Sequence, residues 1–285
     1  MNETQALQKM ETDIRLRGLT KSTFKNYTSN VKKFFAFCNR PIEELDETDV
    51  RRFLEHLILE KKLAPRTVNQ HSAAIRFFFA VALNRPMNYL QIPLMKVPKS
   101  LPEVLTREEV SKLISVCENA KHKAMLLLAY GSGLRVSEIQ SLRVNDIDSK
   151  EMRVFVKGGK NKRDHYTVLS QTTLVALYDY WNKFQPHNPE GWLFPGLGKK
   201  GHITRNAMAL AFESCAKKAN ITKDVSPHSL RHAFGTHLFE DGSDLVKIKE
   251  LLGHHRIQST TIYVHLANTV TKGVVSPADT MGDSK

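Results

Sequence analysis

A run of prolines divides this chain into two folding units. Residues 84–102, NRPMNYLQIPLMKVPKSLP, place four prolines in nineteen positions. No continuous helix or central strand tolerates that density, because proline lacks a backbone N–H and fixes φ. Directly afterwards Thr106 and Glu109 form a capping-box pattern ahead of an apolar run, which indicates the first helix of a new domain. A length of 285 residues also favours two hydrophobic cores over one. We therefore expect a domain at 1–90, a linker at 91–103, a second domain at 104–270 and a tail at 271–285.

Hydrophobic periodicity predicts that both domains are mainly helical. Apolar residues recur at helical spacing over 21–38, again after Asp46, and again over 65–83, and the first of these helices carries lysines largely on its other side. In the second domain the stretch 151–170 alternates like two short strands around a basic turn. Further helices are expected at about 172–184, 204–219, 227–240 and 244–252. The predicted fold class is mainly α with a small β-sheet, and the mixed α/β part lies in the second domain.

An excess of positive charge points to a polyanionic partner. The chain has 42 Lys and Arg against 29 Asp and Glu, a formal net charge of +13, and both domains share this excess. Such a balance favours nucleic acid or an anionic membrane. The longest apolar runs, at 77–83 and 124–130, fall far short of the roughly 20 residues that a bilayer-spanning helix needs. The N-terminus also lacks the apolar core of a secretory signal, so we expect a cytoplasmic protein that binds nucleic acid and has no membrane partner.

Several short motifs suggest other functions, and each has a simpler interpretation. GLGKKG at 196–201 matches the dinucleotide fingerprint, but that pattern is meaningful only between a strand and a helix, so we interpret it as a basic loop. His228 and His232 have the i, i+4 spacing of zinc ligands, yet Arg231 lies between them and a third ligand is missing. Neither a metal nor any other cofactor is expected. The three cysteines are too few for a disulfide framework and occupy apolar positions of helical patterns, so we expect them in the cores: Cys38, Cys117 and Cys215.

Two arginines stand where the backbone favours an anion. Ser226 and Pro227 are typical of a helix start, so His228 and Arg231 share a face of the first turn, where free N–H groups also attract negative charge. Arg135 follows the residues GSGL, whose glycines let the chain approach a ligand, and Glu138 one turn later is placed to hold its guanidinium. Each motif alone is equally compatible with solvated side chains at a helix end.

The order of these motifs is more specific than any one of them. GLRVSE at 133–138, a lysine-rich hairpin, HSLR at 228–231, LGH at 252–254 and Tyr263 follow one another along the chain. This order resembles the tyrosine recombinase family, which includes the integrases and the Xer-type recombinases. The resemblance covers nearly the whole chain and implies a helical core-binding domain and a catalytic domain that together form a clamp around DNA. It implies that Tyr263 is the nucleophile and that the remaining catalytic residues are Arg135, Lys160, His228, Arg231 and His254, with Glu138 in support.

The chemistry that the resemblance implies is consistent with these residue types. Two guanidiniums suit the extra negative charge of a pentacoordinate phosphorus, His228 suits the proton of the attacking phenol, and His254 suits donation to the phosphate. A lysine at the hairpin can protonate the departing 5′ oxygen. Aligning the hairpin on residues 166–170 selects Lys160, although Lys157 and Lys162 are alternatives, and it places His165 where the family commonly has arginine.

The resemblance further implies a site-specific DNA recombinase that works through 3′-phosphotyrosyl intermediates and a Holliday junction. It would act as a homotetramer on two double-stranded DNA sites, with or without a partner recombinase, in integration, excision or dimer resolution. The tail at 271–285 is expected either to pack on a neighbouring protomer or to be disordered. Two alternatives remain open at this point: a non-catalytic DNA-binding regulator and a type IB-like topoisomerase. Candidate DNA contacts are Lys25, Arg66, Thr67, Asn69 and Lys162.

Overall fold

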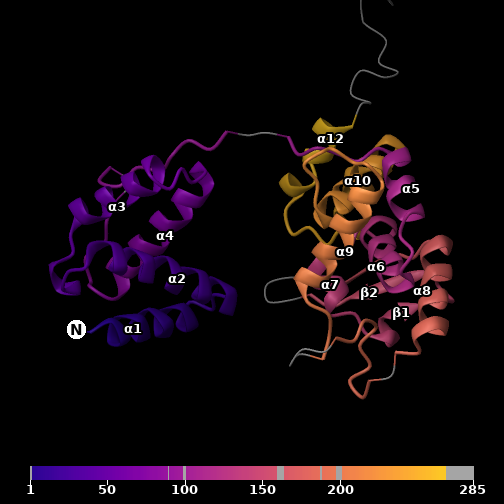
Figure 1. The fold of residues 1–285 in the computed structure, drawn as a ribbon, viewed down its shortest axis with the longest axis horizontal. Helices are drawn as coiled ribbons and strands as arrows, with labels where there is room; N and C mark the ends of the chain where they lie inside the picture. Colours follow the sequence, from indigo (N-terminus) through magenta and orange to yellow (C-terminus); the bar gives the residue numbers. More distant parts are fainter. Residues whose placement is uncertain are drawn as a thin grey trace, which may run out of the picture. The chain divides into compact units, whose positions relative to one another are not determined.

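The fold was analysed in a computed structural model, which describes residues 2–88, 90–98, 101–158, 164–186, 188–196 and 201–267. The chain forms two compact units, Met1–Ser100 and Leu101–Lys285 (Figure 1). Both are dominated by helices, and the second also holds a small sheet, which confirms the predicted fold class. Within the described residues, no helix is long and apolar enough to cross a membrane.

The first unit is a helical bundle closed by aromatic rings. Phe34, Phe53, Phe78 and Phe79 are buried at its centre and contact one another edge-on or tilted. The three expected helices are present, and Asp46, with Asp49 at the third helical position, caps one of them through reciprocal hydrogen bonds. In the part that is described, the elements are α1 (Glu3–Leu16), α2 (Lys21–Cys38), the 3₁₀ helix η1 (Ile42–Glu44), α3 (Glu47–Leu59) and α4 (Pro65–Val81).

Two features of the first unit were not predicted. Helix α1 forms from a polar segment in which Ala6, Met10 and Ile14 recur every four residues and bury a narrow apolar stripe. The residues after α4 also pack against the unit: Ile92 is 1% exposed, and Asn69 exchanges two hydrogen bonds of 2.9 Å with the main chain of Met95. Much of the segment that the sequence assigned to the linker therefore contributes to the packing of the first unit.

The second unit is built around one buried helix. Helix α6 buries Ala124 through Ala129 and packs against α8 and α10 (Figure 1). Its described helices are α5 (Arg107–Ser115), α6 (Ala120–Gly131), α7 (Val136–Gln140), η2 (Val144–Asp146), α8 (Gln171–Phe184), α9 (Arg205–Lys218), α10 (Pro227–Glu240), α11 (Leu245–Leu251), η3 (Ile257–Ser259) and α12 (Ile262–Leu266). The helices expected at 172–184, 204–219, 227–240 and 244–252 correspond to α8 to α11 and agree within a residue or two.

The sheet is a three-stranded antiparallel meander in the order β1-β2-β3. Its strands are β1 (Ile147–Asp148), β2 (Arg153–Val156) and β3 (His165–Val168), with Val154 opposite Thr167. Strand β1 adds to the two strands that the sequence predicted. Around 196–201 the described residues form only isolated antiparallel bridges and no parallel strand–helix unit, which disfavours a dinucleotide site there. Most of that loop, residues 197–200, lies outside the described residues.

All three cysteines are free, and two of them lie in a core as expected. Cys117 and Cys215 are buried in the core of the second unit. Cys38 is only half-buried and packs at the edge of the first core. Burial raises the pKa of the Cys38 thiol to about 11 and that of Cys117 to about 12, so both thiols are protonated near neutral pH.

Candidate active site

A buried arginine joins three separate segments of the second unit. Arg231 is the fifth residue of α10 and is 1% exposed. Its guanidinium donates to the carbonyl oxygens of Gly133 at 2.7 Å and Leu252 at 2.6 Å, and lies 3.4 Å from Glu138 Oε2. Burial is the main cause that lowers the pKa of Arg231 to about 10, and the positive charge of Arg135 adds to it. The guanidinium nevertheless stays charged at neutral pH.

A second arginine is held beside the first by the same carboxylate. Arg135 precedes α7, and Glu138 Oε1 accepts from its guanidinium at 2.5 Å while Glu138 Oε2 accepts from its main-chain N–H at 2.8 Å. Burial alone would raise the pKa of Glu138, but the charge and N–H of Arg135, together with the charge of Arg231, hold it below its usual value. The centre thus contains two cations and one anion, and this imbalance favours a further anionic ligand.

The turn before Arg135 requires a glycine. Gly133 has φ +64°, and a Cβ there would lie 2.4 Å from the ring of Phe234 and 2.8 Å from Leu252. The carbonyl of this residue also accepts from Arg231. The glycine that the sequence analysis interpreted as allowing close approach to a ligand therefore allows close approach of α10 and α11.

Tyr263 lies in the short helix α12 with its ring packed flat against α10. The side chain is 1% exposed, and a Cβ on Gly235 would come within 2.5 Å of its Cζ. The His254 ring is stacked on it, with centroids 6.3 Å apart and an interplanar angle of 8°. Burial raises the pKa of Tyr263, while the charges of Arg231 and Arg135 oppose that shift. The phenol is therefore protonated at neutral pH.

Neutral imidazoles surround the two arginines. His254 Nδ1 lies 2.9 Å from Thr260 Oγ1, and burial, then the charges of Arg231 and Arg135, lower the pKa of His254 to about 3. Burial, followed by the same two charges, also lowers the pKa of His228. His232 contacts the His228 ring edge-on at 4.5 Å.

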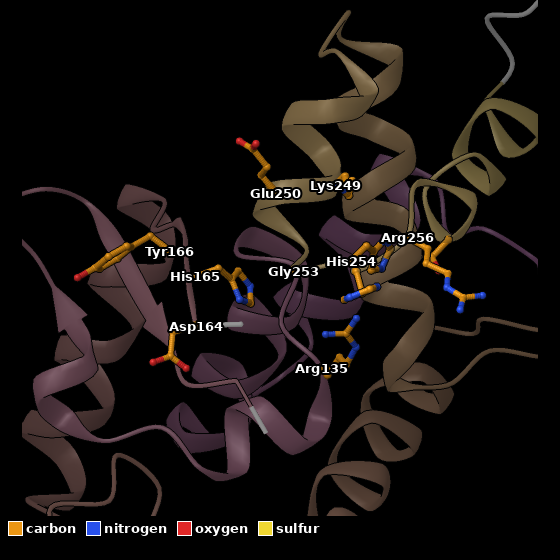
Figure 2. Close-up of a pocket in the computed structure, with 11 residues that line it drawn as sticks. Arg135, Asp164, His165, Tyr166, Lys249, Glu250, Gly253, His254 and Arg256 are labelled. Carbon is orange, nitrogen blue, oxygen red and sulfur yellow. The ribbon is translucent and has the colours of Figure 1, made fainter. Parts of the chain in front are cut away.

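The same part of the molecule contains an open cavity of about 800 Å³. Figure 2 shows Arg135 extending toward His254 within it, Arg256 beside them, and His165 next to Gly253. A Cβ on Gly253, whose φ is +56°, would lie 2.4 Å from the His165 ring, so β3 and the turn after α11 are in close contact. The cavity is thus walled by the hairpin on one side and by the residues around His254 on the other.

The structure brings together Arg135, Glu138, His228, Arg231, His254 and Tyr263, which are the described members of the candidate set. Lys160 and Lys162 lie outside the described residues. The alternative lysine, Lys157, is exposed, and its Nζ lies 3.7 Å from Asp146 Oδ1. Among the described parts of the chain, no group of three His, Cys, Asp or Glu side chains could hold a metal ion, so the pair His228 and His232 has no third ligand there.

The candidate DNA contacts of the first unit differ from one another. Lys25 and Arg66 are exposed and Thr67 is half-buried. Asn69 does not project freely, because its side-chain oxygen and nitrogen both bond to Met95. This bonding disfavours Asn69 as a DNA contact, since its amide holds the chain segment after α4.

Sequence reasoning missed three residues of this region. Thr260 contacts His254, Gly235 contacts Tyr263, and Arg256 lines the cavity. Thr260 lies three positions before the tyrosine, but nothing in the sequence pairs it with His254. The sequence analysis singled out His232 for its i, i+4 spacing from His228, and that spacing was also the signal for the ring contact that the structure shows.

Comparison with protein families assigns this arrangement. Residues 103–269 match the model of the phage integrase family, and residues 6–89 match that of the phage integrase N-terminal SAM-like domain. The chain belongs to the phage integrase family of tyrosine recombinases. This recombinase is 38% identical over 272 residues to a putative integrase/recombinase of Sinorhizobium fredii, covering 95% of this chain and 87% of the relative. It is also 32% identical over 272 residues to the tyrosine recombinase XerA of Pyrococcus horikoshii, covering 93% and 92%.

Solved structures share the fold of this chain. The Tn1549 transposon integrase in complex with transposon right end DNA matches with a TM-score of 0.72 at 18% identity, covering 91% of this chain and 94% of that one. The XerH site-specific recombinase in its post-cleavage complex with a palindromic difH substrate matches with a TM-score of 0.71 at 19% identity, covering 93% and 82%. At such identities the likeness establishes the fold, while the family matches establish a site-specific recombinase enzyme.

Proposed function

We propose that this recombinase cuts and rejoins DNA strands at specific sites through a covalent 3′-phosphotyrosyl bond to Tyr263. The observation that carries the proposal is the placement of two guanidiniums and one carboxylate beside a buried tyrosine ring. In the pentacoordinate transition state the non-bridging oxygens of the phosphate carry extra negative charge, and Arg135 and Arg231 are suited to stabilise that charge. Four-way Holliday junctions formed by a homotetramer on two double-stranded sites, with or without a partner recombinase, complete the proposed reaction.

Each proton has a candidate carrier. His228 is unprotonated at neutral pH and would accept the proton of Tyr263 as the phosphorus–oxygen bond forms. His254, also neutral, would donate to a non-bridging oxygen. Lys160 would protonate the 5′ oxygen as it leaves. The phosphotyrosyl bond then conserves the energy for rejoining, so the proposed cycle needs neither a metal nor a nucleotide.

The nucleophile is shielded from solvent. Tyr263 is 1% exposed, and its ring lies between the His254 ring and Gly235. Helix α12 spans only five residues and is therefore the element best suited to shift. We propose that α12 shifts when DNA binds to both units, where exposed cations such as Lys25 and Arg66 contact the phosphates. This reaction would take place in the cytoplasm.

Replacing Tyr263 by phenylalanine tests the proposal most directly. Tyr263→Phe removes the hydroxyl and keeps the ring, so we expect site binding to persist and the covalent adduct on denaturing gels to disappear. Tyr180→Phe is a matched control, because Tyr180 is also 1% exposed and donates to the Leu193 carbonyl at 3.1 Å in the same unit. An adduct that survives in Tyr263→Phe would refute the nucleophile.

The lysine assignment needs its own test. A bridging 5′ sulfur leaves as a thiolate and hardly needs a proton, so it should restore cleavage by Lys160→Ala, which otherwise loses about 100-fold or more. Arg135→Ala should show no such rescue, because its contact is with non-bridging oxygens. Rescue of Lys157→Ala or Lys162→Ala, but not of Lys160→Ala, would move the role to that lysine.

Two alternatives remain distinguishable. The catalytic set is complete in sequence, which disfavours a regulator that has lost its chemistry. A type IB-like topoisomerase would relax supercoiled plasmid that lacks a recombination site. The proposed recombinase should instead require two matched sites in the same reaction, and relaxation without them would contradict it.

A further inference from the structure

Thr260 connects the two rings that stack at the centre of the site. It lies between η3 and α12 and is fully buried, with 0% of its surface exposed. Within the described residues, the hydrogen-bond partner of its hydroxyl is His254 Nδ1, at 2.9 Å. Its main-chain carbonyl accepts from the N–H of Tyr263 at 3.0 Å. One residue therefore holds both the histidine ring and the helix of the tyrosine.

The burial of this hydroxyl determines which nitrogen of His254 carries the proton. A threonine hydroxyl always has one hydrogen to donate, and a buried donor without an acceptor costs about 1–3 kcal/mol. If His254 Nδ1 carried a hydrogen, it would occupy the hydroxyl oxygen and leave the Thr260 hydrogen without an acceptor. The satisfied arrangement has Thr260 donating to a bare Nδ1, which places the hydrogen of the neutral ring on Nε2.

We infer that Thr260 is a positioning residue that holds His254 in its Nε2–H tautomer and fixes its ring against Tyr263. The tautomer follows from the geometry alone. Its use rests on the proposed function: with Nδ1 engaged, the Nε2–H group is the donor that His254 presents to a non-bridging oxygen of the scissile phosphate. Neutral His254 can donate in this way because its pKa lies near 3, far below neutral pH.

The sequence provides a matched control at the next residue. Thr261 also donates its hydroxyl locally, to the Gln258 carbonyl at 3.1 Å, and that bond does not involve His254. Thr260→Val removes the hydroxyl and keeps the branched shape, Thr260→Ser keeps the hydroxyl, and Thr261→Val removes the neighbouring hydroxyl. The four proteins, including the unmodified chain, thus differ mainly in whether His254 Nδ1 has a donor.

The first measurement needs no DNA. Long-range ¹H–¹⁵N correlation spectra of the full chain with ¹⁵N-labelled histidine, with the His254 signals assigned by His254→Gln, report its tautomer. We expect the Nε2–H pattern in the unmodified protein, Thr260→Ser and Thr261→Val, and a mixture with the Nδ1–H form in Thr260→Val. An Nδ1–H ring in the unmodified protein, or an unchanged pattern in Thr260→Val, would overturn the inference.

The second measurement is single-turnover formation of the covalent adduct. Thr260→Val should react about 10- to 100-fold more slowly, the usual range for a misplaced catalytic group. Thr260→Ser should recover most of that loss and Thr261→Val should show none. Equal loss in Thr260→Ser and Thr260→Val would also refute the positioning role. If the unmodified protein formed no adduct, the proposed function would fail, whereas the spectra would still decide the tautomer.

Discussion

The two units use the same local device and differ in what surrounds it. In the first, Asp49 is the third residue of α3, accepts from the Asp46 N–H at 3.2 Å and pairs with Arg40 at 3.0 Å. In the second, Glu138 is the third residue of α7, accepts from the Arg135 N–H and pairs with Arg135. Both carboxylates are buried, at 2% and 8% exposed.

The cations around these carboxylates are what differ. Two arginines also lie near Asp49, but Arg40 is 42% and Arg52 65% exposed, and Arg40 pairs with Glu44 as well, so these charges are solvated and balanced. Arg135 is 23% and Arg231 1% exposed, and both face the single charge of Glu138. Holding an unbalanced cation in a low-dielectric site costs stability. The same capping arrangement therefore serves local structure in one unit and, in the other, holds two arginines at the proposed anion site.

Removing one arginine from each unit should have the largest effect and tests this contrast directly. Arg135→Ala should lower the rate of covalent adduct formation by about 100- to 1,000-fold, since it removes a donor to the developing charge. Arg40→Ala should leave that rate within about twofold and should weaken the first unit, because Asp49 loses a charged hydrogen bond worth about 1.5–3 kcal/mol. Single-turnover cleavage and denaturant titration measure the two effects. Similar losses of cleavage in both variants would break the comparison.

Gly235→Ala should stabilise helix α10 in isolation and still lower activity. Gly235→Ala improves helix propensity by about 1 kcal/mol, yet its Cβ would lie 2.5 Å from Tyr263 Cζ and must displace the ring. We expect adduct formation to fall by about 10- to 100-fold, as for other misplaced groups. Ala74→Gly in α4 is the opposite control: it weakens a buried helix of the first unit and should leave the cleavage rate of folded protein unchanged. Full activity in Gly235→Ala would show that the contact with Tyr263 is dispensable.

Acidification should weaken the second unit more than the first. Mainly because both side chains are buried, the pKa of His232 is lowered to about 4 and that of His254 to about 3. Between about pH 6.5 and these two pKa values, the unfolded chain binds more protons than the folded chain. The stability that His232 and His254 contribute as neutral side chains is therefore fully present above pH 6.5 and falls as the pH drops. His71 in the first unit shifts in the same direction, but it is a single group. Hydrogen exchange at pH 7 and pH 5 should therefore show a greater loss of protection in α10 than in α4, and His232→Phe should reduce that loss. Equal losses in both helices would contradict the assignment.

How far the sequence predicted the site depended on the distance between partners. Arg135 with Glu138, and His228 with Arg231, lie one turn apart, so helical spacing alone predicted their shared faces. The bonds from Arg231 to Gly133 and Leu252 join residues 98 and 21 positions apart, and no local pattern reports them. No local pattern reports the bonds between Asn69 and Met95 either. The sequence analysis had predicted Asn69 as a DNA contact and had placed Met95 in the linker. Helix α1 was missed because its apolar stripe is only one residue wide per turn.

The smallest effects are expected for two substitutions in the first unit, one of a polar residue that holds the fold and one of a residue proposed to contact DNA. Asn69→Ala removes two hydrogen bonds to Met95 and should loosen the segment 90–98, costing about 1 kcal/mol per bond. Because that amide is already engaged, the affinity for the DNA site should change less than about threefold. Arg66→Ala removes an exposed cation and should reduce the slope of log affinity against log salt by about one, the value for one lost phosphate contact. Binding titrations between about 50 and 200 mM salt compare the two variants. A change of slope in Asn69→Ala, with none in Arg66→Ala, would return Asn69 to the DNA surface and remove Arg66 from it.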